Sequence, residues 1–395
     1  MAKIADVQEV SLEKLRPYER NAKKHGPEQV EKLKASMQEF GFLTPCLIDS
    51  DYNLIAGHGR VMAAKELGIK TVPCVFIEGL TDEQRRAYIL ADNRLGELGE
   101  WDMELVFEEL VELDDLGFDV ELTGFEMPEE IPEVVEDDFD ESAVSDEPRA
   151  KLGDLYQLGR HRLICGDSTD VNVIERLMDG EKADMVFTDP PWNVNYGANE
   201  HPKYESRTIL NDYMPTEEFK SFMSSAFFCM NNASKDGAMT YVVMSAQEWG
   251  NLMLSLAEND YHWSSTIIWA KDQLVLSRKD YHTQYEPIWY GWKNGSRLHP
   301  LEDRKQSDLW EIPRPKRSDE HPTMKPVELV VRALSNSSKK GDYVLDLFGG
   351  SGTTLIAAEQ LGRRCFMSEL DPHYCDVIIN RWETLTGREA VLIDG

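Results

Sequence analysis

Residues 183–197, ADMVFTDPPWNVNYG, place an acid, two prolines and a tryptophan directly after a short apolar run. The apolar residues Met185–Phe187 predict a buried strand, and the prolines predict a stiff turn, because proline fixes φ at about −65° and has no N–H to donate. A turn that only joined two elements would more commonly use Gly, Asn or Ser. Asp189 offers a carboxylate acceptor, and Trp192 offers a flat apolar face on which a ring can stack. The stretch therefore holds one acceptor and one large ring at a strand end, as a ligand site would require.

A second candidate site lies in residues 341–372, GDYVLDLFGGSGTTLIAAEQLGRRCFMSELDP. This pattern predicts a strand, a glycine loop, a helix closed by Gly362 and a second strand, which is the layout of a nucleotide-type site. The glycines let the backbone approach a ligand, and Glu369, about 20 residues past the loop, can accept hydrogen bonds from ribose hydroxyls. No GK[ST] follows the loop, so a phosphate-binding P-loop is not indicated. Taken alone, FGGSG is equally typical of simple strand–helix packing.

The elements that must position these stretches divide into two parts. From Leu152 onward, short apolar strands alternate with helical patterns, which predicts a mainly parallel, doubly wound α/β sheet. The first 95 residues predict a smaller α/β unit, with helices over 28–41, 60–68 and 81–95 and strands within 45–57 and 71–78. The expected organisation is a small domain over 1–95, an acidic helix and linker over 96–150, and a catalytic domain over 151–395.

The net charge of −30 is concentrated in the middle segment. Residues 95–148 hold 22 Asp or Glu and no Lys, Arg or His, whereas residues 1–94 hold 14 acids and 14 bases. The total charge therefore does not argue against a nucleic-acid partner. Residues 101–119 keep a helical apolar spacing, and the proline-containing acidic stretch 126–148 predicts a disordered or loosely held spacer.

Cysteine usage and hydropathy predict a cytoplasmic protein. The six cysteines are scattered singly, so we expect reduced, mostly buried thiols, no disulfide framework and no metal site. No apolar run approaches the ~20 residues that span a bilayer, and the first residues lack the pattern of a secretory signal. We expect no membrane partner.

Together, DPPW and FGGSG resemble the amino-methyltransferases that act on DNA with S-adenosylmethionine. LICGDSTDV, STIIWAKDQ, YEPIWYGWK and HPTMKPVELV also resemble family segments, so the similarity covers residues 152–392. DPPW precedes the cofactor loop, which is the permuted order of the family's beta class. The resemblance implies a permuted Rossmann-like methyltransferase domain, S-adenosylmethionine as cofactor and double-stranded DNA as partner. The family often forms dimers, so a homodimer is an open expectation.

The resemblance also implies roles for individual residues. Asp189 and the Pro190 carbonyl would accept from an exocyclic amine and localise its lone pair, Pro191 would stiffen the turn, and Trp192 would stack on an extruded base. The residues expected to bind the cofactor are Asp167, Thr323, Lys325, Asp346, Phe348, Gly349, Gly350, Gly352 and Glu369. For Asp167 the alternative is a helix N-cap, and for Lys325 a surface lysine. Trp289, Tyr290 and Trp292 are expected in the core.

An Asp at the start of DPPW resembles enzymes acting on adenine N6 more than the SPP[YF] type common for cytosine N4. Adenine is therefore expected, and cytosine N4, RNA adenine methylation and a non-catalytic scaffold on a DNA-binding protein are the alternatives. Base recognition is expected between YGWK and HPTMKP, where basic residues could contact phosphates or guanine edges. They are Arg297, Arg304, Lys305, Arg314, Lys316 and Arg317. An exposed mixed-charge loop is the alternative for this segment.

Residues 5–95 resemble the ParB-like domain of partition proteins and their nuclease relatives. The resemblance rests on VSLEKLRPYERNAKK, EQVEKLKASMQEFGFLTPCLID and LIAGHGRVMAAKELG. Gly57-His58-Gly59-Arg60 precedes a helix, where free N–H groups attract anions such as nucleotide phosphates. Family members more often carry a second Arg where this chain has Gly59. The expected role is to hold or find DNA, with nucleotide binding and DNA cleavage left open.

Overall fold

The computed structural model describes residues 3–4, 6–99, 101–125, 127, 135–137, 139, 144–145, 147–194, 213–275, 280–301, 306–313 and 324–395. The chain divides into two compact units, Met1–Glu129 and Glu130–Gly395, each described by itself below. This division falls inside the acidic segment that the sequence set apart as residues 96–150.

The N-terminal unit is a small α/β domain, as the sequence predicted. Its strands are β1 (Lys3–Ile4), β2 (Gln8–Ser11), β3 (Cys46–Ile48), β4 (Leu54–Ala56) and β5 (Thr71–Glu78), and its helices begin with α1 (Pro27–Phe40), α2 (His58–Glu66) and α3 (Asp82–Leu95). The central strand β5 pairs antiparallel with β1 and β2 and parallel with β3. Thr81 begins α3 with a capping box, in which its side chain accepts from the Gln84 N–H and Gln84 reaches back.

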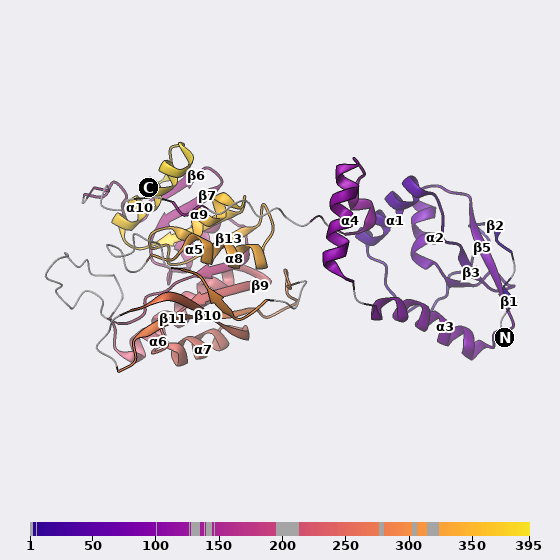
Figure 1. Cartoon of the computed structure of the whole chain (residues 1–395), viewed down its shortest axis with the longest axis horizontal. Helices are drawn as coiled ribbons and strands as arrows, with labels where there is room; N and C mark the ends of the chain where they lie inside the picture. The colour runs from indigo at the N-terminus through magenta and orange to yellow at the C-terminus, as the bar shows by residue number, and fades with distance from the viewer. Residues whose placement is uncertain are drawn as a thin grey trace. The chain divides into compact units, whose positions relative to one another are not determined.

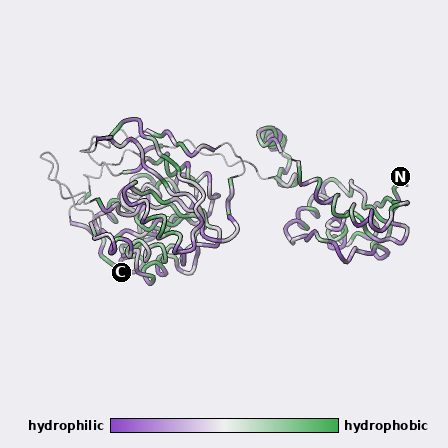
Figure 2. Tube along the Cα trace, turned by 90° about the horizontal axis from the view of Figure 1, so that it is seen from below, coloured by the Kyte–Doolittle hydropathy of each residue, from purple (hydrophilic) through white to green (hydrophobic). Residues whose placement is uncertain are grey.

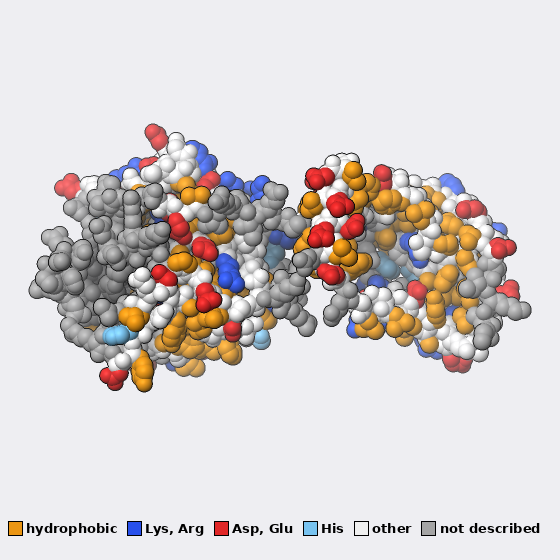
Figure 3. All heavy atoms as spheres, viewed as in Figure 1, with side chains coloured by type: hydrophobic (Ala, Val, Ile, Leu, Met, Phe, Trp, Pro, Cys, Tyr) orange, Lys and Arg blue, Asp and Glu red, His pale blue; other side chains and the backbone are white. Residues whose placement is uncertain are grey.

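The helical part of the acidic segment belongs to this first unit. It comprises η1 (Gly96–Leu98), α4 (Met103–Asp115) and η2 (Val120–Thr123). The ring of Phe118, which follows α4, stacks on Phe40 of α1 with 5.8 Å between ring centroids. Figure 3 shows acidic side chains gathered on α4. Leu110 of α4 is buried, whereas Leu105, Val111 and Leu116 remain exposed, so the helix predicted over residues 101–119 forms but buries only part of its apolar side chains.

The second unit contains a ten-stranded sheet within its described residues, in the order β12-β10-β11-β9-β8-β13-β14-β7-β6-β15. The strands are β6 (Leu155–Leu158), β7 (His161–Cys165), β8 (Ala183–Thr188), β9 (Ser234–Val243), β10 (Tyr261–Val275), β11 (Thr283–Lys293), β12 (Leu309–Glu311), β13 (Tyr343–Asp346), β14 (Arg364–Glu369) and β15 (Val391–Asp394). The strands β9, β8, β13, β14 and β7 are parallel neighbours. β11 runs antiparallel between β9 and β10. The predicted mainly parallel sheet is confirmed.

Helices cover both faces of this sheet (Figure 1). They are α5 (Val171–Met178), α6 (Thr216–Ala233), α7 (Trp249–Glu258), α8 (Val327–Ser337), α9 (Thr353–Gln360) and α10 (Pro372–Thr386). The core under α8, α9 and α10 is separate from the core under α5, α6 and α7. Because both faces are covered, β8 is buried along its whole length, as its apolar sequence predicts. Figure 2 shows hydrophobic segments running through the middle of this unit.

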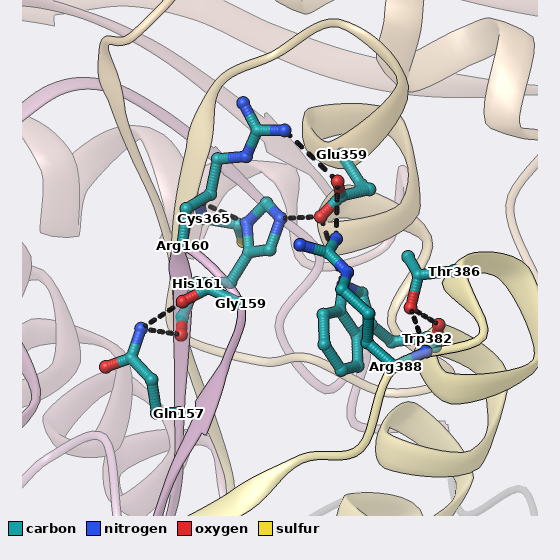
Figure 4. A network of polar contacts seen from close by, with 9 residues as sticks. All are labelled: Gln157, Gly159, Arg160, His161, Glu359, Cys365, Trp382, Thr386 and Arg388. Atoms are coloured by element: carbon teal, nitrogen blue, oxygen red, sulfur yellow. Dashed lines mark hydrogen bonds and ion pairs between the residues drawn. The ribbon is translucent and has the colours of Figure 1, made fainter.

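A polar network around Glu359 fastens the turn between β6 and β7 to α9 and α10 (Figure 4). Four side chains donate to this carboxylate: Arg160, His161, Trp382 and Arg388. His161 is fully buried, and its Nδ1 accepts from the Cys365 N–H, so Nε2 carries the proton donated to Glu359. Burial would raise the pKa of Glu359, but these donors hold it far below its usual range. The network is structural and leaves Glu359 no reactive role.

The cysteines are free and buried, as expected. Among the helices of the described residues, none is both long and apolar enough to cross a bilayer. Trp289 and Tyr290 are buried in the core, and Trp292 packs at its margin, as the sequence predicted.

Candidate active site

The two stretches singled out in the sequence meet at one edge of the sheet. β8 ends at Thr188 and its parallel neighbour β13 ends at Asp346, so DPPW and the glycine loop begin side by side. The Thr188 hydroxyl donates to Asp346 Oδ1 at 2.8 Å and accepts from the Leu347 N–H at 3.3 Å. From β13 the chain continues toward β14, whereas from β8 it continues toward β9. This divergence makes the pair a topological switch point, where open α/β sheets bind ligands.

The DPPW turn presents its carboxylate with two partners already in place. Trp192 Nε1 donates to Asp189 Oδ1 at 3.0 Å, and Lys325 Nζ lies 2.6 Å from Oδ2. The Lys325 ammonium also lies over the indole, 5.0 Å from the ring centroid. Asn193, at φ +57°, closes the turn by accepting from the Met214 N–H at 2.7 Å. The acceptor and the stacking face are therefore fixed relative to each other.

Behind Asp189 runs a chain of four alternating charges. Lys271 of β10 pairs with Glu286 of β11 at 2.5 Å, and Glu286 lies 3.4 Å from Lys325, which pairs with Asp189. Although burial disfavours its charge, Asp189 and Glu286 hold the pKa of Lys325 above its usual value. Burial would likewise raise the pKa of Glu286, but Lys325 and Lys271 lower it. Glu286 and Lys325 therefore stay charged, and the Lys325 ammonium is fixed against Asp189.

Asp189 itself differs from the other members of this chain. Burial raises its pKa above the usual value, and Glu286 adds to the rise, while Lys325 opposes it. The carboxylate is thus ionised by its lysine partner yet binds a proton more readily than an exposed aspartate. That combination suits a group that accepts a hydrogen bond from an amine and then takes its proton.

The glycine loop has the conformation that a close-fitting ligand site needs. Gly350 and Gly352 have φ of +51° and +84°, and a Cβ on Gly349 would lie 2.7 Å from the Met367 sulfur. Glu369, at the end of β14, accepts from the Gly350 N–H at 2.8 Å and from the Asp371 N–H at 2.9 Å. Each carboxylate oxygen can still accept from a ribose hydroxyl. These residues fit a nucleoside-containing cofactor.

Two carboxyls at this loop, one buried (Asp346) and one half-buried (Glu369), have no cationic partner among the described residues. Burial raises the pKa of Asp346 and of Glu369 to about 7 in each case. Asp346 accepts from the Thr188 and Thr354 hydroxyls and from the Phe348 N–H. Hydrogen bonds alone thus hold both groups, and a cationic ligand would favour their ionised forms.

The structure also locates the other predicted cofactor residues. Asp167 follows β7 at the same sheet edge and accepts from the Thr169 N–H and hydroxyl, while Asp170 caps α5. The helix N-cap alternative for Asp167 is therefore wrong. Phe348 packs against Phe222, with 5.9 Å between ring centroids. Thr323 lies outside the described residues.

Lys325 is placed at the catalytic turn. Its ammonium contacts Asp189, whereas its backbone carbonyl accepts from the Thr353 hydroxyl at the start of α9. It is buried, so the surface-lysine alternative is wrong. Glu286 and Lys271 were missed in the sequence, although both lie within quoted segments, YEPIWYGWK and STIIWAKDQ. An acid and a base inside otherwise apolar strands were the available signal.

The predicted DNA-contacting residues divide by position. Arg304, Lys305, Arg314, Lys316 and Arg317 lie outside the described residues. Arg297 follows β11, and the adjacent Leu298 N–H bonds to the Gly237 carbonyl near the start of β9. That is the amino edge of the parallel strands, opposite Asp189. The Arg297 guanidinium lies over Trp292, 5.2 Å from the ring centroid. The structure does not bring it to the active site.

Asp184, His299 and Asp342 form a cluster at this opposite edge that could in principle hold a metal ion. Lys235 Nζ already pairs with Asp184 at 2.5 Å, and His299 pairs with Asp342 at 2.9 Å. The lysine supplies the positive charge that a metal would bring, so this cluster is best described as an ion-pair group.

In the N-terminal unit, Gly57 adopts a left-handed conformation at φ +103° and begins α2. His58 Nε2 accepts from the Tyr18 N–H, and burial lowers the pKa of His58, so its ring is neutral. A Cβ on Gly59 would lie 3.0 Å from His25 Nδ1, which leaves no room there for a second arginine without rearrangement. A hollow of about 190 Å³ beside this loop is lined in part by Lys23, His25, His58 and Lys65.

A parallel sheet with an acceptor-bearing turn beside a glycine loop defines the Rossmann-like methyltransferase class. Residues 183–381 match the DNA methylase family, and the chain belongs to that family. Residues 1–94 match the ParB N-terminal domain.

Individual relatives agree with both assignments. The type II methyltransferase M2.DpnII of Streptococcus pneumoniae is 26% identical over 228 residues, covering 52% of this chain and 84% of that protein. The ParB-like nuclease domain-containing protein YnaK of Escherichia coli (strain K12) is 49% identical over 75 residues, covering 19% of this chain and 86% of that protein. The solved M1.HpyAVI-SAM complex is 20% identical, with coverage of 55% and 98% and a TM-score of 0.42.

The protein is therefore a DNA methyltransferase that uses S-adenosylmethionine and carries a ParB-like N-terminal domain. The predictions of family, fold class and cofactor are confirmed. The family includes enzymes for adenine N6 and for cytosine N4.

Proposed function

We propose that this enzyme methylates the exocyclic N6 amine of adenine in duplex DNA. The observation that carries the proposal is Asp189, an ionised carboxylate fixed at the carboxyl end of β8 by Lys325 and Trp192. An aspartate at the first position of this motif resembles the adenine enzymes, whereas a serine is common in enzymes for cytosine N4.

The reaction requires the amine lone pair, which is delocalised into the base, to become available. Asp189 and the Pro190 carbonyl accept the two amine N–H groups and turn the lone pair out of the ring plane. The Trp192 indole stacks on the extruded base and excludes water. When bound, S-adenosylmethionine supplies a methyl group on a positively charged sulfur.

Proton transfer completes the step. Glu369 and the glycine loop would hold S-adenosylmethionine, which would supply the methyl group and keep the electron pair of the broken S–CH₃ bond, so the amine nitrogen would carry the positive charge. Asp189 takes one proton from that nitrogen and passes it to water. Its raised pKa favours this transfer, and Lys325 restores the ionised form for the next turnover.

The base and the polymer are tested in one experiment. The full chain is incubated with labelled S-adenosylmethionine and either duplex DNA or RNA of mixed sequence, and the digested nucleosides are separated by mass. We expect label in N6-methyl-2′-deoxyadenosine from DNA, none in RNA nucleosides, and none with Asp189→Ala. Label in N4-methylcytosine or in RNA would refute the adenine–DNA assignment, and absence of any label would favour a non-catalytic scaffold.

We further infer that the N-terminal unit holds DNA for the catalytic unit. The support is the hollow beside the Gly57–Arg60 loop, whose lining includes Lys23 and Lys65 and no carboxylate. Lys65→Glu is expected to raise the KM for DNA while leaving kcat at saturating DNA unchanged. An unchanged KM for DNA, or strand cleavage by the wild-type protein, would contradict this role.

A further inference from the structure

Three residues of the acidic segment are bound to the catalytic unit. Val135 exchanges two hydrogen bonds with the Gln360 side chain of α9, at 3.2 and 2.9 Å. Glu136 accepts from the Glu328 N–H in the first turn of α8 at 3.1 Å. Asp137 binds the Arg381 guanidinium of α10 at 2.6 and 2.7 Å. The expected loosely held spacer is therefore wrong for residues 135–137, which we call the strap.

The Asp137 contact is the strongest of the three. It is bidentate and charge-assisted, and Arg381 is only 1% exposed. Among the described residues, Asp137 is the only carboxylate recorded in an ion pair with Arg381. A buried guanidinium without its anion is unfavourable, so the strap and α10 depend on each other.

Arg381 connects the strap to the cofactor loop. Its Nη1 donates to the Ser351 carbonyl at 2.9 Å and to the Thr353 hydroxyl at 3.1 Å. Ser351 lies between Gly350 and Gly352, which both adopt left-handed conformations. Glycine has little conformational preference of its own, so contacts from outside the loop must hold its shape. The same Thr353 hydroxyl donates to the Lys325 carbonyl. A single guanidinium thus fixes the glycine loop and one backbone anchor of Lys325.

We propose that the strap is a cofactor-loop clamp, with Asp137 as a positioning residue that preorganises the S-adenosylmethionine site through Arg381. With Asp137 bound, the Ser351 carbonyl is held and the loop N–H groups keep the orientation in which Gly350 meets Glu369. Without it, Arg381 turns toward water or another acceptor, and the loop must be ordered by the cofactor itself. The clamp does not depend on which base is methylated.

The test compares two full-length variants that each remove one negative charge from the acidic segment. Asp137→Asn keeps the shape of the side chain and removes the negative charge that pairs with Arg381. Glu147→Gln is the matched control, because Glu147 is exposed and its side chain has no contact among the described residues. For each, the Kd of S-adenosylmethionine is measured by titration calorimetry, and kcat is measured at saturating cofactor and DNA.

We expect Asp137→Asn to raise the cofactor Kd about tenfold, which corresponds to ~1.4 kcal/mol, with kcat within about twofold of wild type. Glu147→Gln should leave both unchanged. By reciprocity, S-adenosylhomocysteine should slow amide hydrogen exchange at residues 135–137 in the wild type. An unchanged Kd in Asp137→Asn would overturn the proposal, even with a lower melting temperature. Strap exchange that is insensitive to S-adenosylhomocysteine would overturn it too.

Discussion

Replacing Lys325 with methionine tests the assignment of Asp189 as an ionised acceptor. Methionine keeps a long apolar stem over the Trp192 ring and removes only the ammonium. At 2.6 Å and an effective dielectric of about 20, the Coulomb energy of the Lys325–Asp189 pair is ~6 kcal/mol. Asp189 is 27% exposed, and water will replace part of that interaction. We take about half, ~3 kcal/mol, as the interaction lost in the variant, and its loss raises the pKa of Asp189.

The sign of the pH effect follows from the protonation state that the reaction needs. Asp189 can take the amine proton only when it is ionised, so activity falls as pH drops through its pKa. In Lys325→Met this pKa is higher, and the acid limb of the single-turnover rate should move up by about two pH units. At a pH above the new limb, the rate should return to within about tenfold of wild type.

The assay is single-turnover methyl transfer from pH 5 to 9 with saturating DNA and cofactor. Lys271→Met is the matched control, since Lys271 pairs with Glu286 and does not contact Asp189. Its acid limb should move less than that of Lys325→Met. A uniform loss of rate with an unmoved limb and a higher cofactor Kd would refute the reasoning, and would favour the cofactor-flanking role that the sequence predicted for Lys325.

Three further predictions address other parts of the catalytic unit. Trp192→Ala should abolish methyl transfer to DNA while the cofactor Kd, measured by calorimetry, stays near wild type; normal transfer would exclude the stacking role. Glu369→Gln should make the free energy of unfolding fall less between pH 5 and 8 than it does in the wild type. The folded pKa of Glu369 is raised from 4.5 to about 7, so its carboxyl contributes stability at low pH that is lost as pH rises through 7. That contribution is at most ~3 kcal/mol, and parallel urea-derived profiles for the two proteins would contradict it. Glu359→Ala should lower the free energy of unfolding by ~3 kcal/mol, because buried His161 and Trp382 lose their acceptor; urea denaturation showing a loss below ~1 kcal/mol would count against the network of Figure 4.

The sequence predicted the elements whose signals are local. The strand–glycine–helix–strand run from Tyr343 to Glu369 follows from apolar runs and the glycine turn, and the capping residue Thr81 follows from its position before α3. DPPW and the glycine loop meet because parallel strands share a carboxyl edge. These features need no knowledge of distant contacts.

Residues that meet through strand register could not be predicted in the same way. Glu286 pairs directly with Trp269 across β10 and β11, so Lys271, two residues after Trp269, is its diagonal neighbour on the same face of the sheet. One residue of slip would point them to opposite faces, and the sequence does not state the register. The direction of β11 similarly decides where Arg297 lies. Since β11 runs antiparallel to β9, the end of β11 and the following Arg297 lie at the amino edge of the parallel strands. The strap was missed because composition predicts disorder but cannot show that one acid meets a buried arginine.

The pKa shifts of three carboxyls that are buried or half-buried in this unit differ in direction, and the direction distinguishes a structural acid from two acids at the cofactor loop. Glu359 has four donors, two of them guanidinium groups, and they hold its pKa far below the usual range despite burial, so these donors add to the stability of the native state at neutral pH. Asp346 and Glu369 have hydrogen bonds but no cation among the described residues, and their pKa values rise to about 7. Ionising these two carboxyls without a cation costs folding stability at neutral pH, and a bound cationic cofactor with ribose hydroxyls offsets that cost. The cofactor should accordingly stabilise the protein more at pH 8 than at pH 6, because the ionised carboxyls that it favours are the form that destabilises the free enzyme.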